Sequence, residues 1–388
     1  MVPIFLAAIA VTTFFEGGSL GRMEQVAPAH VQCAVEGQSD QDGRNRQANW
    51  YYFRLDGLPR TEIRIDLTDL EGEYNYRPDS YSVTPRTRPV YSYDNRSWRH
   101  FDNTQVTWDD ARKHLILRLT PQRGRIWIAH AVPYTTAHLF RLRREIERSP
   151  FAGWTSAGPT SQGRDLPLVT VAEGAPPRAV WLMARQHAWE TGTSWVIEGA
   201  LRFLVSADPG AAVLRRRFIW KIFPMADPDG VANGKVRFNA QGYDVNRNWD
   251  RPGSASTPEI WAMKRAMLAW LDSGQPVDLF LAMHNQESGD YLDGPEGPLA
   301  TRLTAALART ASFQAETSPR KTADPKAVAA GRMMVHQSLQ HERSVPAFLM
   351  EMAVEENRKL NRLRSVEDNL QFGRELVLAI GEALGEGK

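Results

Sequence analysis

The order of hydrophobic and polar positions divides the chain into two parts. Up to about residue 131 the apolar residues fall in short runs, and the run at 62–67 alternates strictly between apolar and polar positions. The other runs of this kind are at 50–55, 80–83, 89–93, 114–119 and 125–130. Short alternating runs separated by polar turns are typical of strands that bury one face. Their number and spacing predict an all-β antiparallel sandwich over residues 1–131.

From Pro133 onward, longer helical patterns alternate with apolar runs. Thr135 or Thr136 is placed to cap a first helix that continues to about Ser149. The expected strands are 166–171, 178–184, 217–223, 277–283 and 346–352, and the further expected helices are 190–205, 258–271, 298–311 and 365–384. This alternation predicts a doubly wound α/β domain with a mostly parallel mixed sheet over residues 132–388.

Composition and charge narrow the classes of function. Hydrophobic residues make up 42% and charged residues 24% of the chain, and the net charge is +2. No global electrostatic argument favours nucleic acid or a membrane surface as a partner. The single cysteine, Cys33, excludes an intrachain disulfide and favours a reducing, cytoplasmic compartment. It also leaves His, Asp and Glu as the expected metal ligands, while no pattern indicates an oligomeric state.

The first apolar stretch permits two interpretations. Residues 3–10 have the character of the apolar core of an export signal, and Ala8-Ile9-Ala10 could serve as a cleavage site. No Lys or Arg precedes this stretch, and Phe14-Phe15 follow closely. We therefore favour a first strand or an overlong start, with export as the alternative. No apolar run approaches the ~18–20 residues of a membrane-spanning helix.

Candidate metal ligands follow two of the apolar runs in the second part. His187 comes after the run 178–184, with Glu190 three residues further on, and His284 ends the run 279–283. Three such ligands with an open fourth position would have the form of a catalytic zinc site. Glu287 also stands three residues after His284, so spacing alone leaves open which glutamate binds the metal.

Motifs between these two histidines resemble a known family. Pro228-Asp229-Gly230 follows the predicted strand 217–223, then comes Arg237, then the string Asp244-Val245-Asn246-Arg247-Asn248-Trp249. Here the sequence resembles the zinc carboxypeptidases of the carboxypeptidase A type, and it is most similar to their cytosolic carboxypeptidase branch. That branch has an all-β domain ahead of the catalytic domain, and residues 15–21 resemble the opening of that β domain.

The resemblance implies a role for each matching residue. His187, Glu190 and His284 would bind one Zn²⁺ per chain, which would leave Glu287 without a metal. Asn246 and Arg247 would hold the terminal carboxylate of the substrate, the arginine through a bidentate pair.

Two further residues would carry the chemistry. Arg237 would polarise the scissile carbonyl and stabilise the oxyanion. Glu351 would be the general base that takes a proton from the attacking water, with Glu355 and Glu356 as nearby competitors.

The function implied is hydrolysis of the last peptide bond at the C-terminus of a peptide or protein. Arg332 lies in a segment that resembles the place where the cytosolic branch faces the terminal side chain, so it would favour C-terminal Glu or Asp. One alternative is a zinc amidase acting on cell-wall peptides or acyl-amino acids, and another is a non-catalytic peptide-binding protein. Ala188-Trp189 departs from the Pro-Gly that the family has between the first His and Glu.

Overall fold

The computed structural model describes residues 8–314 and 332–385 and divides the chain into two compact units. One unit is Met1–Thr135 with Gly230–Phe238, and the other is Thr136–Asp229 with Asn239–Lys388. The chain thus returns to the first unit for nine residues in the middle of the second. Residues 1–7, which hold most of the apolar run considered as an export signal, lie outside the described residues, as does Gly331.

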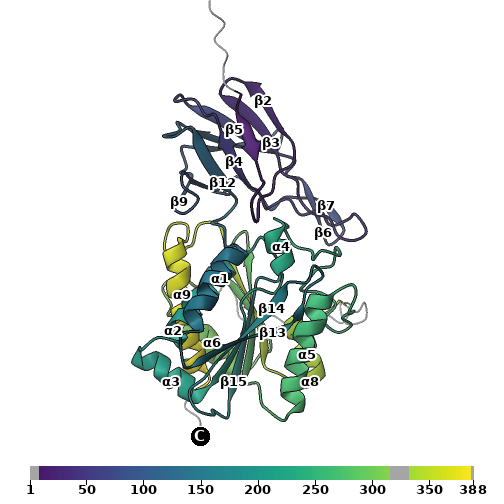
Figure 1. The fold of residues 1–388 in the computed structure, drawn as a ribbon, viewed down its shortest axis with the longest axis vertical. Coiled ribbons are helices and arrows are strands. Elements are labelled where there is room, and N and C mark those ends of the chain that lie inside the picture. Colours follow the sequence, from purple (N-terminus) through teal and green to yellow (C-terminus); the bar gives the residue numbers. More distant parts are fainter. Residues whose placement is uncertain (1–7, 315–331, 386–388) are drawn as a thin grey trace, which may run out of the picture. The chain divides into compact units, whose positions relative to one another are not determined.

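The first unit is a sandwich of two five-stranded sheets (Figure 1). One sheet has the order β1-β4-β12-β8-β9 and the other β10-β11-β5-β3-β2. Their bounds are β1 Ala10–Thr12, β2 Met23–Ala27, β3 His30–Ala34, β4 Tyr52–Asp56, β5 Ile63–Thr68, β8 Val90–Ser92, β9 Trp98–His100, β10 Val106–Asp109, β11 His114–Leu119 and β12 Arg125–Ala129. The predicted β-sandwich is confirmed, although β3 pairs with β5 in parallel and every other pair in these two sheets is antiparallel.

One predicted strand of the first unit is wrong. The run 80–83 contributes only Ser80 to a strand, at the end of β7 (Arg77–Ser80), which pairs with β6 (Gly72–Tyr74) in a small hairpin. Val83 is fully buried in the core from an irregular segment, and Tyr81 packs beside it. The alternation that suggested a strand therefore reflects burial of these two side chains and not pairing of the backbone.

The second unit contains a seven-stranded mixed sheet with the order β13-β14-β16-β15-β17-β19-β18. The four central strands are parallel, and the edges are antiparallel. The bounds are β13 Ala152–Pro159, β14 Asp165–Val171, β15 Ala179–Ala184, β16 Ile219–Phe223, β17 Leu279–Gln286, β18 Tyr291–Asp293 and β19 Ala347–Ala353. The predicted mixed sheet is confirmed, whereas the edge strands β13 and β18 have no counterpart among the predicted runs.

Helices cover both faces of this sheet, as a doubly wound fold requires (Figure 1). The helices are α1 Thr136–Ile146, α2 Thr191–Leu204, α3 Pro209–Arg217, α4 Pro228–Ala232, α5 Pro258–Asp272, α6 Pro298–Leu307, α8 Val335–Arg343 and α9 Val366–Ala383. Alternate residues of each central strand join different cores. In β15, Val180, Leu182 and Ala184 pack with α2, α6 and α9. Ala179, Trp181 and Met183 pack on the other face, with α5 and α8.

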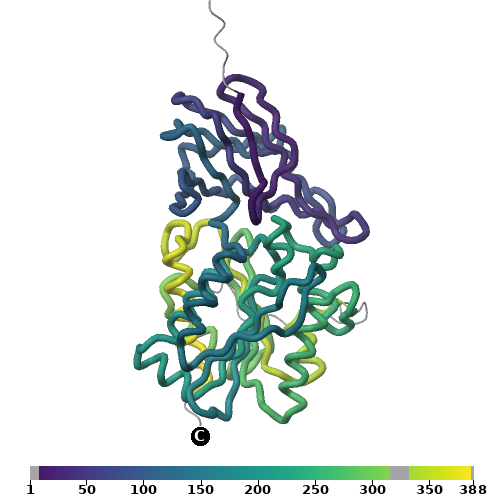
Figure 2. Tube along the Cα trace, in the orientation of Figure 1, coloured from purple at the N-terminus to yellow at the C-terminus, as the bar shows by residue number. Residues whose placement is uncertain are grey.

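Two glycines let α2 and α9 (yellow in Figure 2) approach closely. A Cβ on Gly199 would lie 2.0 Å from the carbonyl oxygen of Leu370, and a Cβ on Gly373 would lie 2.0 Å from that of Val196. These distances are far below van der Waals contact with backbone atoms that cannot rotate away. The crossing of the two helices therefore requires glycine at both positions.

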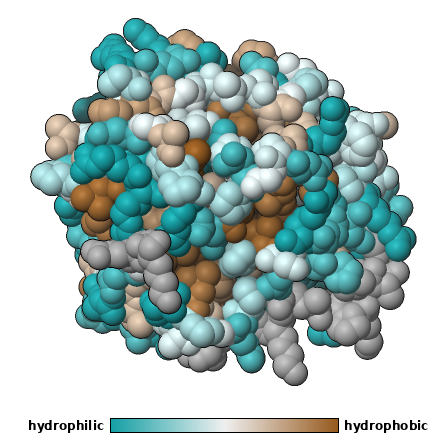
Figure 3. All heavy atoms as spheres, turned by 90° about the horizontal axis from the view of Figure 1, so that it is seen from below, coloured by the Kyte–Doolittle hydropathy of each residue, from teal (hydrophilic) through white to brown (hydrophobic). Residues whose placement is uncertain are grey.

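Hydrophilic residues predominate on the face in Figure 3, and hydrophobic residues are visible between them. Among the helices of the described ranges, none combines the length and the apolar character needed to cross a bilayer.

Candidate metal centre

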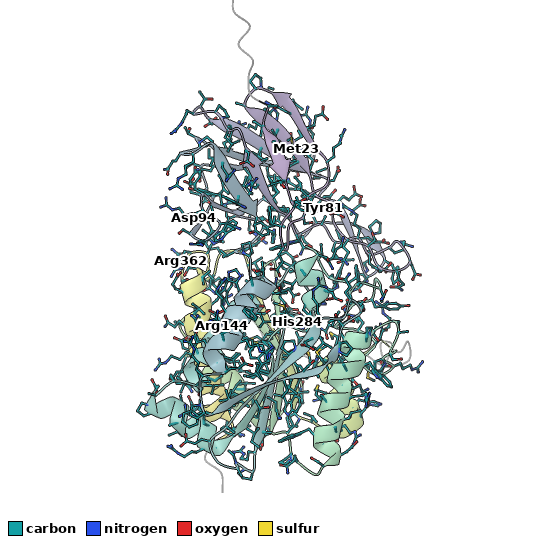
Figure 4. All side chains as sticks on the ribbon, in the orientation of Figure 1. Met23, Tyr81, Asp94, Arg144, His284 and Arg362 are labelled. Atoms are coloured by element: carbon teal, nitrogen blue, oxygen red, sulfur yellow. The ribbon has the colours of Figure 1, made fainter. Side chains whose placement is uncertain are left out.

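Two histidines and one glutamate of the second unit meet at the carboxyl ends of β15 and β17. His187 Nδ1 lies 2.7 Å from Glu190 Oε1, and His284 Nδ1 lies 3.0 Å from Glu190 Oε2. All three residues are at most 2% exposed, and one ligand atom from each lies within 4.8 Å of the other two. His284 is labelled over the central sheet in Figure 4. The glutamate that meets both histidines is Glu190, whereas Glu287 is not in this cluster.

The loop that presents His187 and Glu190 is held from inside by Arg185. This residue has a φ of 61°, a left-handed conformation that residues other than glycine rarely adopt. Its buried side chain donates from Nε to Ala188 O at 2.8 Å and from a terminal nitrogen to Ser194 Oγ at 3.0 Å. These bonds fix the sharp turn after β15 and connect it to α2, whose N-cap is Glu190. Trp189 is only 5% exposed, so it packs inside the protein.

The far side of each histidine ring faces a hydrogen-bond acceptor. His187 Nε2 lies 3.0 Å from Asp244 Oδ1, and His284 Nε2 lies 3.1 Å from Gln186 Oε1. A ring that donates its Nε2–H to these oxygens has an unprotonated Nδ1, which is the nitrogen directed at Glu190. Acceptors of this kind fix the tautomer and orientation of metal-binding histidines.

The sequence alone indicates no role for Asp244 or Gln186. Neither spacing nor residue type distinguishes an oxygen that orients a histidine from any other polar side chain in a loop. Asp244 stands two residues before Asn246, and its Oδ1 also accepts from Asn246 N at 2.8 Å. That short turn places the carboxylate beside His187, and it becomes visible only in the fold.

The electrostatics of the cluster suit a divalent cation. Burial by itself raises the pKa of Glu190, but the neighbouring His187 and His284 outweigh burial and hold this pKa well below its ordinary value. Glu190 also stands at the positive N-terminal end of α2, which favours a carboxylate. A buried carboxylate with two inward-facing imidazole nitrogens is a donor set that zinc prefers. The residues present therefore fit the metal that the motifs implied.

Glu351 lies in the same row of the sheet as His284. In the ladder β17-β19-β18, His284 pairs with Glu351, and Glu351 pairs with Tyr291. Paired residues of neighbouring strands point to the same face of a sheet. Glu351 is half-buried, and the Tyr291 hydroxyl lies 3.5 Å from its Oε1. Both His284 and Glu351 lie inside their strands, because β17 and β19 extend two residues beyond them.

The two residues expected to bind a carboxylate adjoin this cluster. Asn246 is buried, and its Nδ2 lies 3.2 Å from His284 Nε2 while its Oδ1 accepts from Val335 N at 3.2 Å. Arg247 is half-exposed and donates to Asn246 O at 2.9 Å. Within residues 8–314 and 332–385, no carboxylate lies at ion-pair distance from its guanidinium. Arg247 therefore retains donors for an anion.

The remaining two predicted residues lie on other segments. Arg332 is half-buried and precedes α8, and its neighbour Met333 is tied to the Asn246 loop by bonds with Trp249 and Asp250. Arg237 lies in the segment Gly230–Phe238, which clusters with the first unit. The guanidinium carbon of Arg237 lies 5.6 Å from the centre of the Tyr74 ring, at a cation–π distance.

Models of two protein families match the chain. The zinc carboxypeptidase model matches residues 145–289, and the model of the cytosolic carboxypeptidase N-terminal domain matches residues 11–130. The two matches follow one another along the chain and fall on the second and first units, respectively.

Relatives and solved structures agree with both matches. A protein of unassigned function from Zymomonas mobilis is 28% identical over 74% of this chain and 71% of its own length. Cytosolic carboxypeptidase 1 of Danio rerio is 40% identical over 70% of this chain but only 26% of its own length. The chain thus spans about a quarter of that vertebrate relative. A metallo-carboxypeptidase from Burkholderia cenocepacia has 25% identity and a TM-score of 0.83, and the match covers 97% of this chain and 99% of that one.

The order of the two domains, the ligand cluster and these matches agree: the chain contains a zinc carboxypeptidase domain preceded by a cytosolic carboxypeptidase N-terminal domain.

Proposed function

We propose that this chain is a zinc-dependent carboxypeptidase that hydrolyses the C-terminal peptide bond of peptides or protein tails. One observation carries the proposal. Two buried histidines direct Nδ1 at the carboxylate of Glu190, while oxygens of Asp244 and Gln186 lie 3.0 and 3.1 Å from the opposite ring nitrogens. Three buried ligand atoms gathered in this way, with polar groups behind both imidazole rings, are typical of a metal site.

The predicted residues would divide the chemistry between them. Zinc, when bound by His187, Glu190 and His284, would acidify a water molecule and polarise the scissile carbonyl. Glu351 lies beside His284 in the sheet, so it is placed to accept the proton of the attacking water and to return it to the leaving amine. Arg237 would donate to the oxyanion that develops on the carbonyl oxygen.

Asn246 and Arg247 would restrict the reaction to the end of a chain. A guanidinium that has no carboxylate partner among the described residues can form a bidentate pair with the terminal carboxylate of a substrate. Internal peptide bonds and amidated ends offer no such anion. The position of Asn246 next to His284 supports binding of that carboxylate within reach of the metal ligands.

A preference for C-terminal Glu or Asp is the more specific part of the proposal, and it rests on Arg332. The segment that follows Arg332 is held to the Asn246 loop, because Val335 N donates to Asn246 Oδ1 at 3.2 Å. The half-buried guanidinium of Arg332 would attract an acidic side chain at the end of the substrate. Next to an apolar side chain it would lose hydration without gaining a partner.

A zinc amidase would share the metal ligands and Glu351, so only its substrates would separate it from a carboxypeptidase. A non-catalytic peptide-binding protein has no use for a glutamate beside the metal ligands, and the position of Glu351 argues against it. The unpaired carboxylate-binding donors of Arg247 favour a carboxypeptidase over an amidase whose substrate lacks a free carboxylate.

Mass spectrometry of a peptide library with varied C-terminal residues tests the proposal. The zinc-loaded chain should remove single residues from the C-terminus, and peptides ending in Glu or Asp should react first. Cleavage only of N-acyl or cell-wall amide bonds would favour the amidase. Equal turnover of peptides ending in Glu, Lys and Phe would exclude the role of Arg332. It would not contradict the proposed carboxypeptidase activity.

The proposal includes a cytoplasmic location. It is supported by the single buried thiol, Cys33, and by the names of the relatives, which include cytosolic carboxypeptidases.

A further inference from the structure

We propose that Gln38 of the N-terminal β domain is a positioning residue for Arg237, and that this domain thereby contributes to the rate of the proposed reaction. The inference rests on the proposed role of Arg237 as the group that stabilises the oxyanion. It assigns the N-terminal domain a part in turnover through one side chain.

The side-chain amide of Gln38 forms hydrogen bonds with three consecutive residues of the segment that carries Arg237. Its Oε1 accepts from the backbone N–H groups of Val236, Arg237 and Phe238 at 2.9, 2.8 and 3.0 Å. Its Nε2 donates to Phe238 O at 2.7 Å. These four bonds join residues about 200 positions apart in the sequence, and both partners belong to the first unit.

Three successive N–H groups that converge on one oxygen form a curved backbone nest, which ordinarily binds an anion. Here the oxygen of a glutamine takes the place of the anion. Because Arg237 is the central residue of the nest, its φ and ψ angles are set by the position of Gln38 Oε1.

Gln38 is itself held rigidly. Its backbone N–H donates to Gln47 O, and its carbonyl accepts from Gln47 N, both at 2.8 Å. Gly37, with a φ of 68°, turns the chain immediately before it, and a Cβ there would lie 2.9 Å from Gln47 O. The backbone of Gln38 is thus fixed by Gln47, and its side-chain amide bonds to residues 236–238. Both attachments leave the segment that carries Arg237 little freedom to move.

The side chain of Arg237 is guided from the same domain. Its guanidinium lies at cation–π distance from Tyr74, which belongs to the β6–β7 hairpin. The N-terminal domain thus supplies both the backbone anchor and a stacking surface for this arginine.

Such an anchor matters for rate because oxyanion stabilisation depends on fine placement. A donor has to lie about 2.7–3.1 Å from the oxygen in the transition state. A displacement of about 1 Å costs roughly 100-fold in rate. Loss of the nest should therefore lower kcat more than it weakens substrate binding.

The test uses the zinc-loaded full chain with three N-acylated dipeptides ending in Glu, Lys and Phe. Gln38→Met keeps the volume of the side chain but removes both hydrogen-bonding groups. We expect kcat on the best of these substrates to fall about 10- to 50-fold and KM to change less than about threefold. Gln38→Glu retains the acceptor oxygens, so it should keep kcat within about fivefold of the wild type. Amide exchange of residues 236–238 should accelerate in Gln38→Met.

Lys235→Ala is the matched control. Lys235 and Glu36 form an ion pair at 3.6 Å between the same two segments, without touching the amides of the nest. This variant should leave kcat and amide exchange unchanged.

A double-mutant cycle separates this inference from the proposed function. If Gln38 acts through Arg237, then the double variant should have a kcat less than about twofold below that of Arg237→Ala alone. A large loss in Arg237→Ala combined with wild-type kcat in Gln38→Met would overturn the role of Gln38 alone. Wild-type kcat in Arg237→Ala would overturn the role of Arg237 and the inference with it. Fully additive losses would also overturn it.

If Gln38→Met does not fold, Gln38→Asn serves instead, because its shorter side chain cannot reach all three amides. Wild-type kcat together with accelerated amide exchange in Gln38→Asn would contradict the inference.

Discussion

His187 Nε2 lies 3.0 Å from Asp244 Oδ1, on the side of the ring opposite to Glu190. A ring that donates its Nε2–H to this carboxylate leaves Nδ1 free to bind a metal. Fifty-seven residues separate the two side chains in sequence, and the turn that precedes Asn246 brings them together.

This relationship predicts that Asp244→Asn binds zinc more weakly. Loss of the negative charge behind His187 should raise the zinc dissociation constant about 10- to 100-fold. Competition with a chromophoric chelator measures the constant directly. Asp250→Asn, six residues further along the same segment, is the control and should bind zinc within about twofold of the wild type. Equal zinc affinity in Asp244→Asn and wild type would show that the carboxylate does not orient His187.

A second prediction concerns the recognition of the substrate's end. Arg247→Ala should raise KM on the order of 100-fold, because a charge-assisted pair contributes about 2–3 kcal/mol. The control is the same peptide with an amidated C-terminus, on which wild type and variant should perform equally poorly. Steady-state kinetics on both peptides provide the comparison. If Arg247→Ala still discriminated fully against the amidated peptide, then another residue would hold the carboxylate.

A third prediction concerns the packing of α2 against α9. Gly373→Ala should destabilise the fold by about 2–4 kcal/mol, because the added methyl group would meet the carbonyl oxygen of Val196 at 2.0 Å. Urea unfolding measures the change. Gly153→Ala adds the same atom to an exposed strand residue with nothing within 4 Å, and it should leave stability nearly unchanged. Similar midpoints for the two variants would contradict the close crossing.

The sequence predicted the parts of this fold that depend on long, regular patterns. The mixed sheet and its flanking helices follow from apolar periodicity, since each central strand buries both faces and reads as a continuous apolar run. The edge strands β13 and β18 have no apolar signal, because β13 consists mainly of small residues without an alternating apolar pattern and β18 has three residues. Patterns of hydrophobicity carry little information about strands that are paired on one side only.

The residues of the candidate site also fall into two groups: those that the sequence indicates and those that only the fold reveals. His187, Glu190 and His284 stand out because they follow apolar runs of the sequence, and the fold brings them together. The oxygens behind the histidines, Asp244 and Gln186, depend on contacts across loops and leave no periodic trace. The same holds for Gln38, whose partners lie about 200 residues away.

A fourth prediction follows from His130, which is 5% exposed. Burial lowers its pKa from 6.5 to about 4. Between these values the unfolded chain binds a proton that the folded chain does not, so the free energy of unfolding should decrease as the pH falls from about 6.5 to 4. The full effect of this one group amounts to about 3 kcal/mol and is absent above pH 6.5.

Urea unfolding at a series of pH values from 4.5 to 7.5 measures this dependence. His130→Gln cannot titrate, so its unfolding free energy should vary less steeply with pH than that of the wild type. The comparison uses slopes, because the substitution itself will change the absolute stability. Parallel slopes would mean that His130 is not the group responsible.

The most direct test of the account is the rate at which the zinc-loaded chain releases the C-terminal amino acid of a peptide, compared with Glu351→Gln at equal zinc content. Glu351 pairs with His284 across the sheet, and the substitution keeps its shape while removing its capacity to accept a proton. We expect the wild type to release single residues and Glu351→Gln to be slower by about 10²- to 10⁴-fold. Wild-type rates in Glu351→Gln would contradict the role of Glu351 as the general base. If the zinc-loaded wild type released no C-terminal residue from any peptide of a varied library, the proposed carboxypeptidase activity would be contradicted.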